Sequence, residues 1–118
     1  MLSKAKEFPD MICNELDRAT PLHFAIVSGN LENAKILLRN GANVNSKDAN
    51  DNTPMHFAVS SNNLRTVRLL DEYGASATSV NVDEICAIDI ALTEDFKDIK
   101  MHFLGQSKYA DFDFTGMR

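Results

Sequence analysis

One six-residue segment returns after 33 residues, and this repeat constrains the fold more than any other feature. Residues 20–25 read TPLHFA, residues 53–58 read TPMHFA, and a weaker copy, CAIDIA, begins after the same interval at residue 86. Three further pairs keep the interval, namely Leu31 with Leu64, Leu37 with Leu70 and Gly41 with Gly74. Several matches in one register indicate stacked copies of one structural unit, none of which buries its apolar face alone.

Each copy begins in the way a helix begins. Thr20 and Thr53 are of a residue type that caps helix N-termini, and the Pro after each one stands at N1, where its missing N–H costs nothing. We expect the short helix that follows to end near Gly29, because glycine accepts the left-handed backbone conformation found after helices. Asn62 holds that place in the second copy, and asparagine tolerates the same conformation.

A second helix is predicted in each copy, over about 31–40 and 64–73, with its apolar residues on one face. The segments 42–52 and 75–85 are rich in Asn, Asp and Ser, so they are expected to form turns with a short extended hairpin. Small residues recur at one place in the first helices, where they would let neighbouring copies pack closely: Ala25, Ala58 and Ala91.

The chain resembles the ankyrin-repeat family. TPLHFA followed by LLRNGANVN is very close to the pattern of that family, and the resemblance covers roughly residues 8–104. It implies an all-α fold, an ankyrin-repeat solenoid of antiparallel helix pairs with short β-hairpin-like loops. A single domain over 1–104 would hold an N-terminal half-repeat or cap (1–19), two good repeats (20–52 and 53–85) and a degenerate terminal repeat (86–104). An aromatic and acidic tail (105–118) would follow this domain.

The third copy departs from the family pattern at two places. Asp89 stands where the first two copies have His23 and His56. One residue is also missing before the last helix if Phe96 matches Leu64. Terminal repeats are often atypical, because one of their faces meets solvent.

The turns that precede each copy are a further departure. The family usually has Gly two residues before the Thr that opens a repeat, and this chain has Arg18, Asp51 and Glu84 there. Asp adopts a positive φ at modest cost, whereas Arg and Glu do so reluctantly. We therefore expect the turns at Arg18 and Glu84 to differ from the family geometry.

Charge and composition disfavour several classes of partner. The net charge is -5, from 12 Lys and Arg against 17 Asp and Glu. Binding to nucleic acid or to an anionic membrane depends on Lys and Arg, so neither partner is expected. Cys13 and Cys86 form no disulfide framework and no zinc-ligand spacing. No apolar run is long enough for a signal-peptide core or a membrane span, so we expect a cytoplasmic or a nuclear protein.

No catalytic, cofactor-binding or metal-binding residue is predicted, and the protein is not expected to be an enzyme or to bind a small-molecule substrate. The sequence has no Gly-rich phosphate loop, no GxSxG and no HExxH. The resemblance implies that His23 and His56 hydrogen-bond within the loops and support the Thr that opens each copy. Together with Asp89 they would be spaced about 10 Å apart, too far to share one metal ion.

The resemblance places a partner-binding surface on the hairpin tips and on the exposed side of the first helix of each copy. Matched residue by residue, the tips are Leu16, Asp17 and Ala19, then Ala49, Asn50 and Asn52, then Val82, Asp83 and Ile85. The helix positions are Val27 and Ser28, then Ser60 and Ser61, then Thr93 and Glu94. The partner would be another protein, held by an adaptor, scaffold or inhibitor-like module.

Charged residues divide between the two sides of the predicted fold. The acidic set borders the hairpins and comprises Asp17, Asp48, Asp51, Asp83 and Glu84. The basic set belongs to the second helices and comprises Lys35, Arg39, Arg65 and Arg68. We therefore expect a partner segment with Lys or Arg at its rim, because complementary charge steers association.

A structural accessory subunit of a larger multiprotein assembly is the alternative, docked through the repeat ends and the C-terminal tail. The small number of repeats and the apolar residues at the weak ends favour it. In the tail, Tyr109, Phe112 and Phe114 are expected to be exposed, and they would either fold back as a cap on the last repeat or act as a docking peptide. Asn45 stands in a context that resembles the one modified by asparaginyl hydroxylases, although a turn-stabilising role is the simpler interpretation.

Overall fold

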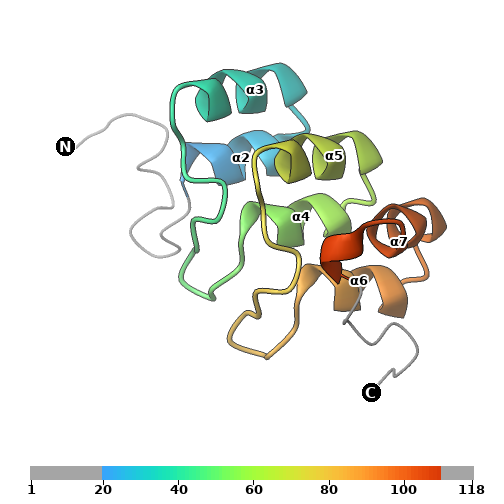
Figure 1. Ribbon diagram of the computed structural model, residues 1–118. Coiled ribbons are helices and arrows are strands. Elements are labelled where there is room, and N and C mark those ends of the chain that lie inside the picture. The colour runs from blue at the N-terminus through green and yellow to red at the C-terminus, as the bar shows by residue number, and fades with distance from the viewer. Residues whose placement is uncertain (1–19, 110–118) are drawn as a thin grey trace.

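In the computed structural model, which describes residues 20–109, six α-helices lie in two layers (Figure 1). In chain order they are α2 (Pro21–Ser28), α3 (Leu31–Arg39), α4 (Pro54–Ser60), α5 (Leu64–Glu72), α6 (Ala87–Thr93) and α7 (Lys97–Leu104), followed by the short 3-10 helix η2 (Ser107–Tyr109). The inner layer is α2, α4 and α6, and each outer helix (α3, α5 or α7) packs on the inner helix before it. No strand is present in this part of the chain. The expected all-α solenoid is confirmed, and the half-repeat predicted over 1–19 lies outside the described residues.

The inner helices approach closely because small residues lie where they meet. Ala25, Ala58 and Ala91 are all buried, as the 33-residue interval predicts. Larger side chains fill the space between the layers at matching places: Leu22, Met55 and Ile88 from the inner helices, and Leu37, Leu70 and Phe103 from the outer ones. These residues belong to one core that runs through all three helix pairs, so the pairs depend on one another for burial.

The loop histidines join each helix pair to the pair that follows. The backbone N–H of Thr53 donates to Nδ1 of His56 (3.0 Å), so the proton of this imidazole lies on Nε2. Nε2 in turn donates to the carbonyl oxygen of Ile85 (2.8 Å), the residue directly before the third pair. The same contacts recur at 3.1 and 3.0 Å in the first pair, between Thr20, His23 and Asn52.

Both histidines are held in the neutral state. Burial lowers the pKa of His23 and His56, although the accepting carbonyl groups and the carboxylate of Asp48 oppose this shift. A protonated ring would have no lone pair to accept the Thr N–H. In the third pair Asp89 takes over the capping role, because its carboxylate accepts the backbone N–H of Cys86 at 3.2 Å.

One residue in the left-handed conformation connects the two helices of each pair. These residues are Gly29, Asn62 and Asp95, with φ of 76°, 54° and 57°. Phe96, the residue after Asp95, is the N-cap of α7, as Asn63 is the N-cap of α5. The 33-residue interval therefore continues into the third pair, because Phe96 corresponds to Asn63. The prediction that Phe96 corresponds to Leu64, with one residue missing before α7, is wrong.

Two hairpin-like loops, residues 48–52 and 81–85, project from the same end of the inner layer (Figure 1). In each loop the N–H of the first residue donates to the carbonyl of the last, at 3.1 and 3.0 Å. The first side chain also accepts from the N–H groups of the third and fifth residues, at 2.9–3.1 Å. These bonds give Asp51 and Glu84 the same φ of 63°, so the expectation that the turn at Glu84 differs is wrong. Arg18 lies outside the described residues.

The chain beyond α7 folds back onto the last helix pair. Tyr109 in η2 is only 7% exposed, and its ring lies edge-on to Phe103 with ring centroids 5.6 Å apart. The expectation that Tyr109 is an exposed docking residue is therefore wrong, because its ring is buried against the end of the core. Phe112 and Phe114 lie outside the described residues.

Polar contacts hold η2 at this position. The carboxylate of Asp71 in α5 accepts from Nζ of Lys108 at 2.6 Å and lies 3.2 Å from Nε2 of His102 in α7. The hydrogen bond to Asp71 raises the pKa of Lys108. One carboxylate thus links α5, α7 and the short helix that follows them.

Acid is expected to destabilise this fold. Since the loop histidines have a lower pKa when folded than when unfolded, the unfolded chain takes up protons first, and the free energy of unfolding falls as the pH goes from about 7 towards about 5. Urea unfolding followed by circular dichroism across this range measures the effect. His56→Gln removes one buried imidazole, so it should be less stable at neutral pH but less sensitive to acid. An unchanged pH slope in this variant would show that other groups cause the sensitivity.

Replacing Tyr109 with alanine is expected to lower the free energy of unfolding by about 2–4 kcal/mol, because the lost ring leaves a cavity beside Phe103. Ser107→Ala lies in the same turn at an exposed position, and it should change stability by less than about 0.5 kcal/mol. Thermal unfolding of both variants makes the comparison. Equally small effects would mean that the Tyr109 ring does not contribute to capping the last repeat.

Candidate functional site

The ends of the inner helices present one pair of exposed residues in each repeat. The pairs are Val27 with Ser28, Ser60 with Ser61, and Thr93 with Glu94. The hydroxyl groups of Ser28 and Ser61 donate back to carbonyl groups of their own helices, at 3.2 and 2.8 Å. The middle of this row is therefore small and polar.

The hairpin tips extend the same surface. Ala49, Asn50, Val82 and Asp83 are exposed, and the two hairpins are joined by a hydrogen bond from the N–H of Val82 to the carbonyl of Asn50 (3.0 Å). Side chains at the tips are thus presented on loops whose backbones are held in place.

Asn52 differs from the other predicted tip residues. It is only partly exposed, and its Oδ1 accepts from Nδ2 of Asn81 in the neighbouring hairpin at 3.0 Å. Its side chain therefore joins the two hairpins to each other. The first predicted set of tips, Leu16, Asp17 and Ala19, lies outside the described residues.

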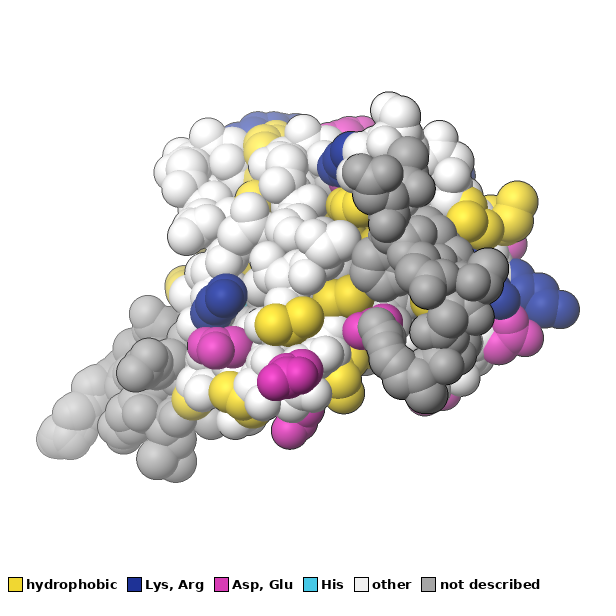
Figure 2. Space-filling view, turned by 60° about the horizontal axis from the view of Figure 1, so that its bottom comes forward, with side chains coloured by type: hydrophobic (Ala, Val, Ile, Leu, Met, Phe, Trp, Pro, Cys, Tyr) yellow, Lys and Arg dark blue, Asp and Glu magenta, His cyan; other side chains and the backbone are white. Residues whose placement is uncertain are grey.

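Apolar side chains are exposed along this surface. Val27 at the end of α2 and Val82 at the second hairpin tip are 59% and 57% exposed, and Ile85 is 38% exposed. Figure 2 shows hydrophobic and acidic side chains next to one another on the side from which the hairpins project. Exposed apolar residues with a polar border are the composition that protein interfaces have.

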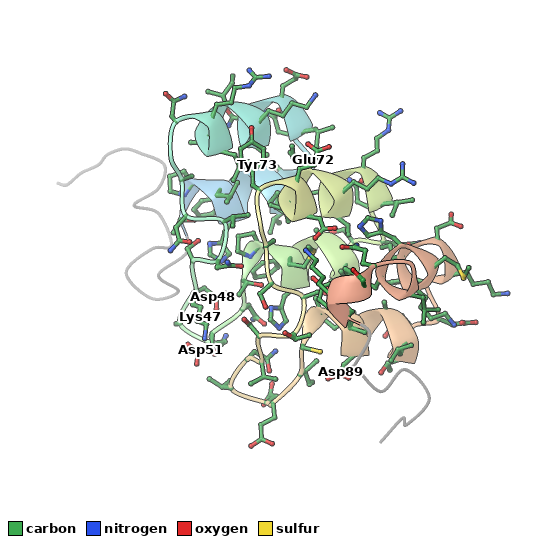
Figure 3. The ribbon with its side chains drawn as sticks, in the orientation of Figure 1. Lys47, Asp48, Asp51, Glu72, Tyr73 and Asp89 are labelled. Atoms are coloured by element: carbon green, nitrogen blue, oxygen red, sulfur yellow. The ribbon has the colours of Figure 1, made fainter. Side chains whose placement is uncertain are left out.

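Carboxylates border the apolar residues. Asp51, Asp83, Glu84 and Glu94 are at least partly exposed there, with Lys47 at the first hairpin. The prediction that Asp48 belongs to this border is wrong, because Asp48 is buried and its Oδ1 accepts two backbone N–H groups at 2.9 Å. Figure 3 shows Lys47, Asp48 and Asp51 on the same hairpin.

Basic side chains lie on the outer helices, as expected. Arg39 of α3 and Arg65 and Arg68 of α5 are exposed. Lys35 is partly exposed, and its Nζ lies 3.7 Å from the carboxylate of Glu32. The charges of the outer layer are therefore mixed, whereas carboxylates predominate at the hairpins and at the end of α6.

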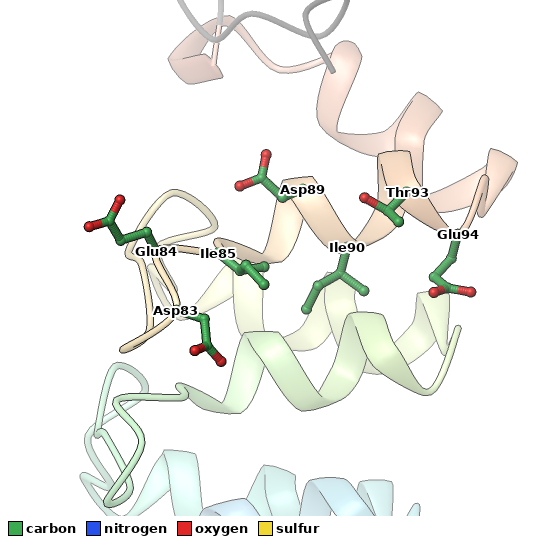
Figure 4. Close-up of a pocket in the computed structure, with 7 residues that line it drawn as sticks. All are labelled: Asp83, Glu84, Ile85, Asp89, Ile90, Thr93 and Glu94. Carbon is green, nitrogen blue, oxygen red and sulfur yellow. The ribbon is translucent and has the colours of Figure 1, made fainter. Parts of the chain in front are cut away.

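A hollow of about 660 Å³ lies over α6. Its lining comes from the second hairpin and from α6, namely Asp83, Glu84, Ile85, Asp89, Ile90, Thr93 and Glu94. In Figure 4 the two isoleucines lie between the carboxylates of the hairpin at one end and Glu94 at the other. The hollow brings together four of the predicted site residues from two elements: Asp83, Ile85, Thr93 and Glu94.

Ile90 was not predicted to be part of this surface, although it lines the hollow. Its counterpart in the second repeat is Phe57, whose ring lies edge-on to His23 with centroids 5.6 Å apart. The replacement of Phe by the smaller Ile at the same place in the repeat was the available signal. Asp89 was considered only as the residue that replaces histidine and as a metal ligand too far from His23 and His56.

The described residues offer no arrangement typical of a metal site or of a reactive thiol. No group of three or more His, Cys, Asp or Glu in residues 20–109 is placed to hold a metal ion. Both ring nitrogens of His23 and His56 are already hydrogen-bonded, so neither ring is available as a ligand. Cys86 is buried, and burial raises the pKa of its thiol, which makes it a poor nucleophile.

Asn45 connects two repeats. Its Oδ1 accepts from the N–H of Ser76 at 2.8 Å, and its Nδ2 donates to the carbonyl of Gly74 at 3.4 Å. The side chain therefore stabilises the start of the following loop. Its modification stays a prediction.

Among residues 20–109, no helix has the length and the apolar character needed to cross a bilayer. A family model described as ankyrin repeats, in three copies, matches residues 2–81. No curated protein was found to match. The match spans more than half of the chain and includes the first two of the helix pairs described above, while α6 and α7 lie beyond it with the same arrangement. This protein belongs to the ankyrin-repeat family.

Proposed function

We propose that this protein is a non-catalytic protein-binding module that grips its partner with the hairpin tips and the exposed side of the inner helices. Ankyrin repeats are generally protein–protein interaction modules and are typically not enzymes. The observation that carries the proposal is the row of exposed side chains that contribute nothing to the core, above all Val27, Val82 and Asp83.

The partner is a protein segment that carries Lys or Arg. Asp51, Asp83, Glu84 and Glu94 surround the exposed apolar residues, with Lys47 among them. A partner with apolar side chains at the centre and basic side chains around them would be complementary to this surface in both respects. The same excess of carboxylates disfavours nucleic acid and anionic membranes. We place the protein in the cytoplasm or the nucleus.

Site-specific cross-linking tests which side of the protein meets the partner. A photoreactive amino acid at Ser60, which is exposed at the end of α4, should capture the partner in cells. The control places the photoreactive amino acid at Arg68, which is exposed on outer helix α5. This control protein should not capture the partner. Capture from Arg68 alone would contradict the proposal.

Charge reversal tests the kind of partner. Once the partner has been identified, Asp83→Lys should lower the association rate by roughly threefold or more at low ionic strength and weaken its dependence on salt, because a steering charge has been reversed. Asp98→Lys makes the same change at an exposed place on outer helix α7. Stopped-flow or surface-plasmon measurements compare the two, and equal rates for both variants would argue against an acidic binding surface.

A structural subunit of a larger assembly is the second candidate, favoured by the outer face of the last repeat. Met101 and Leu104 on α7 are 66% and 50% exposed, which suits burial against a neighbouring subunit. A subunit of this kind should aggregate, or should melt near growth temperature, without its neighbours. A free adaptor should be monomeric and should unfold cooperatively well above that temperature.

A further inference from the structure

We infer that the hollow over α6 receives an arginine side chain of the partner, so that the last repeat anchors the bound segment. This inference rests on the proposed function and names the residue that the surface recognises. The observation behind it is that one hollow combines an apolar strip, formed by Ile85 and Ile90, with carboxylates at both ends of that strip.

The apolar strip suits the stem of a long cationic side chain. Ile85 is 38% exposed, and Ile90 is partly exposed beside it in the lining. Arginine buries its methylene groups along apolar surfaces of this kind while its charged end stays near polar groups. A short acidic or polar side chain would cover neither isoleucine.

The carboxylates suit the guanidinium group. Glu84 and Asp83 belong to the hairpin, and Glu94 is the C-cap of α6, where the partial negative charge of a helix end adds to its own charge. The residues that line the hollow include no Lys or Arg. Arginine fits better than lysine, because its planar, weakly hydrated group binds carboxylates through two parallel hydrogen bonds.

The second repeat does not reproduce the hollow. The residues of α4 that correspond to Ile90 and Glu94 are Phe57 and Ser61, so the carboxylate is absent and the bulkier phenyl ring lies against His23. The anchor is therefore expected in the third repeat, and the rest of the surface would contact neighbouring residues of the bound segment.

Binding of a short peptide tests the inference without knowledge of the partner. The probe is acetyl-Ala-Arg-Ala-amide, titrated into the full chain and followed by the amide chemical shifts of the protein. The shift changes should saturate and concentrate in residues 83–94. The same peptide with citrulline, an uncharged isostere of arginine, should cause much smaller changes. Equal responses to both peptides, or changes spread over the first hairpin and the outer helices, would overturn the inference.

A matched pair of double variants isolates the carboxylates. Glu84→Gln with Glu94→Gln removes two charges from the hollow and should weaken peptide binding by roughly fivefold or more. Glu32→Gln with Glu72→Gln removes two charges from exposed positions on the outer helices α3 and α5, outside the hollow, and should have almost no effect. The melting temperatures of both proteins confirm that each is folded. Equal peptide affinity of the two double variants would contradict the assignment.

The two proposals fail in different ways. If cross-linking from Ser60 captures the partner while the peptide does not bind, the arginine site is wrong and the proposed function stands. If the peptide binds in the hollow while the partner is captured only from Arg68, the arginine site stands and the proposed binding surface is wrong.

Discussion

The hydrogen bond from a histidine to a carbonyl 29 residues further along the chain holds successive repeats in register. Each hairpin is a polar loop without paired strands, and its own hydrogen bonds do not fix it to the helices. The imidazole supplies that connection. One of its nitrogens accepts the backbone N–H of the Thr that caps its own helix, and the other donates to the carbonyl of the residue before the N-cap of the next inner helix. Such a bond contributes only about 1 kcal/mol net, but leaving the buried ring unpaired would cost about 1–3 kcal/mol. This contact therefore fixes where each following helix pair begins relative to the pair before it.

Within each loop, residues whose side chains hold the backbone through hydrogen bonds alternate with residues whose side chains are exposed. Asp48 and Asp51 are three positions apart, yet the first uses its carboxylate to hold the hairpin and the second lies at the surface. Asn52 joins two hairpins, whereas Asn50 points its side chain into solvent. Substitutions at the exposed positions can therefore change the chemistry of this surface without altering the backbone, provided that the hydrogen-bonded positions are kept.

The repeat made most of the fold predictable, because Thr, Pro, His and the positive-φ residues act within a few positions of one another. The errors came from contacts that sequence spacing does not report. In the third repeat Ile99 takes the buried place of Thr66, and this exchange of a polar for an apolar residue hid the register. The prediction for the turn at Glu84 was wrong because the two backbone N–H bonds that the side chain of Asn81 accepts outweigh the intrinsic reluctance of Glu to adopt a positive φ. The burial of Tyr109 could not be predicted from the sequence, because it depends on Phe103 and on the contact between Lys108 and Asp71.

The exchange of Phe57 for Ile90 makes the proposed binding surface unequal along its length. An extended chain lying across the inner helices would meet partly exposed phenyl rings at α2 and α4 and a recess at α6. Reversing that chain would move its long basic side chain to the end where the rings stand and would leave the recess empty. In the proposed mode of binding, the smaller side chain of Ile90 and the carboxylate of Glu94 would together favour one direction of the bound segment, from its N-terminus to its C-terminus.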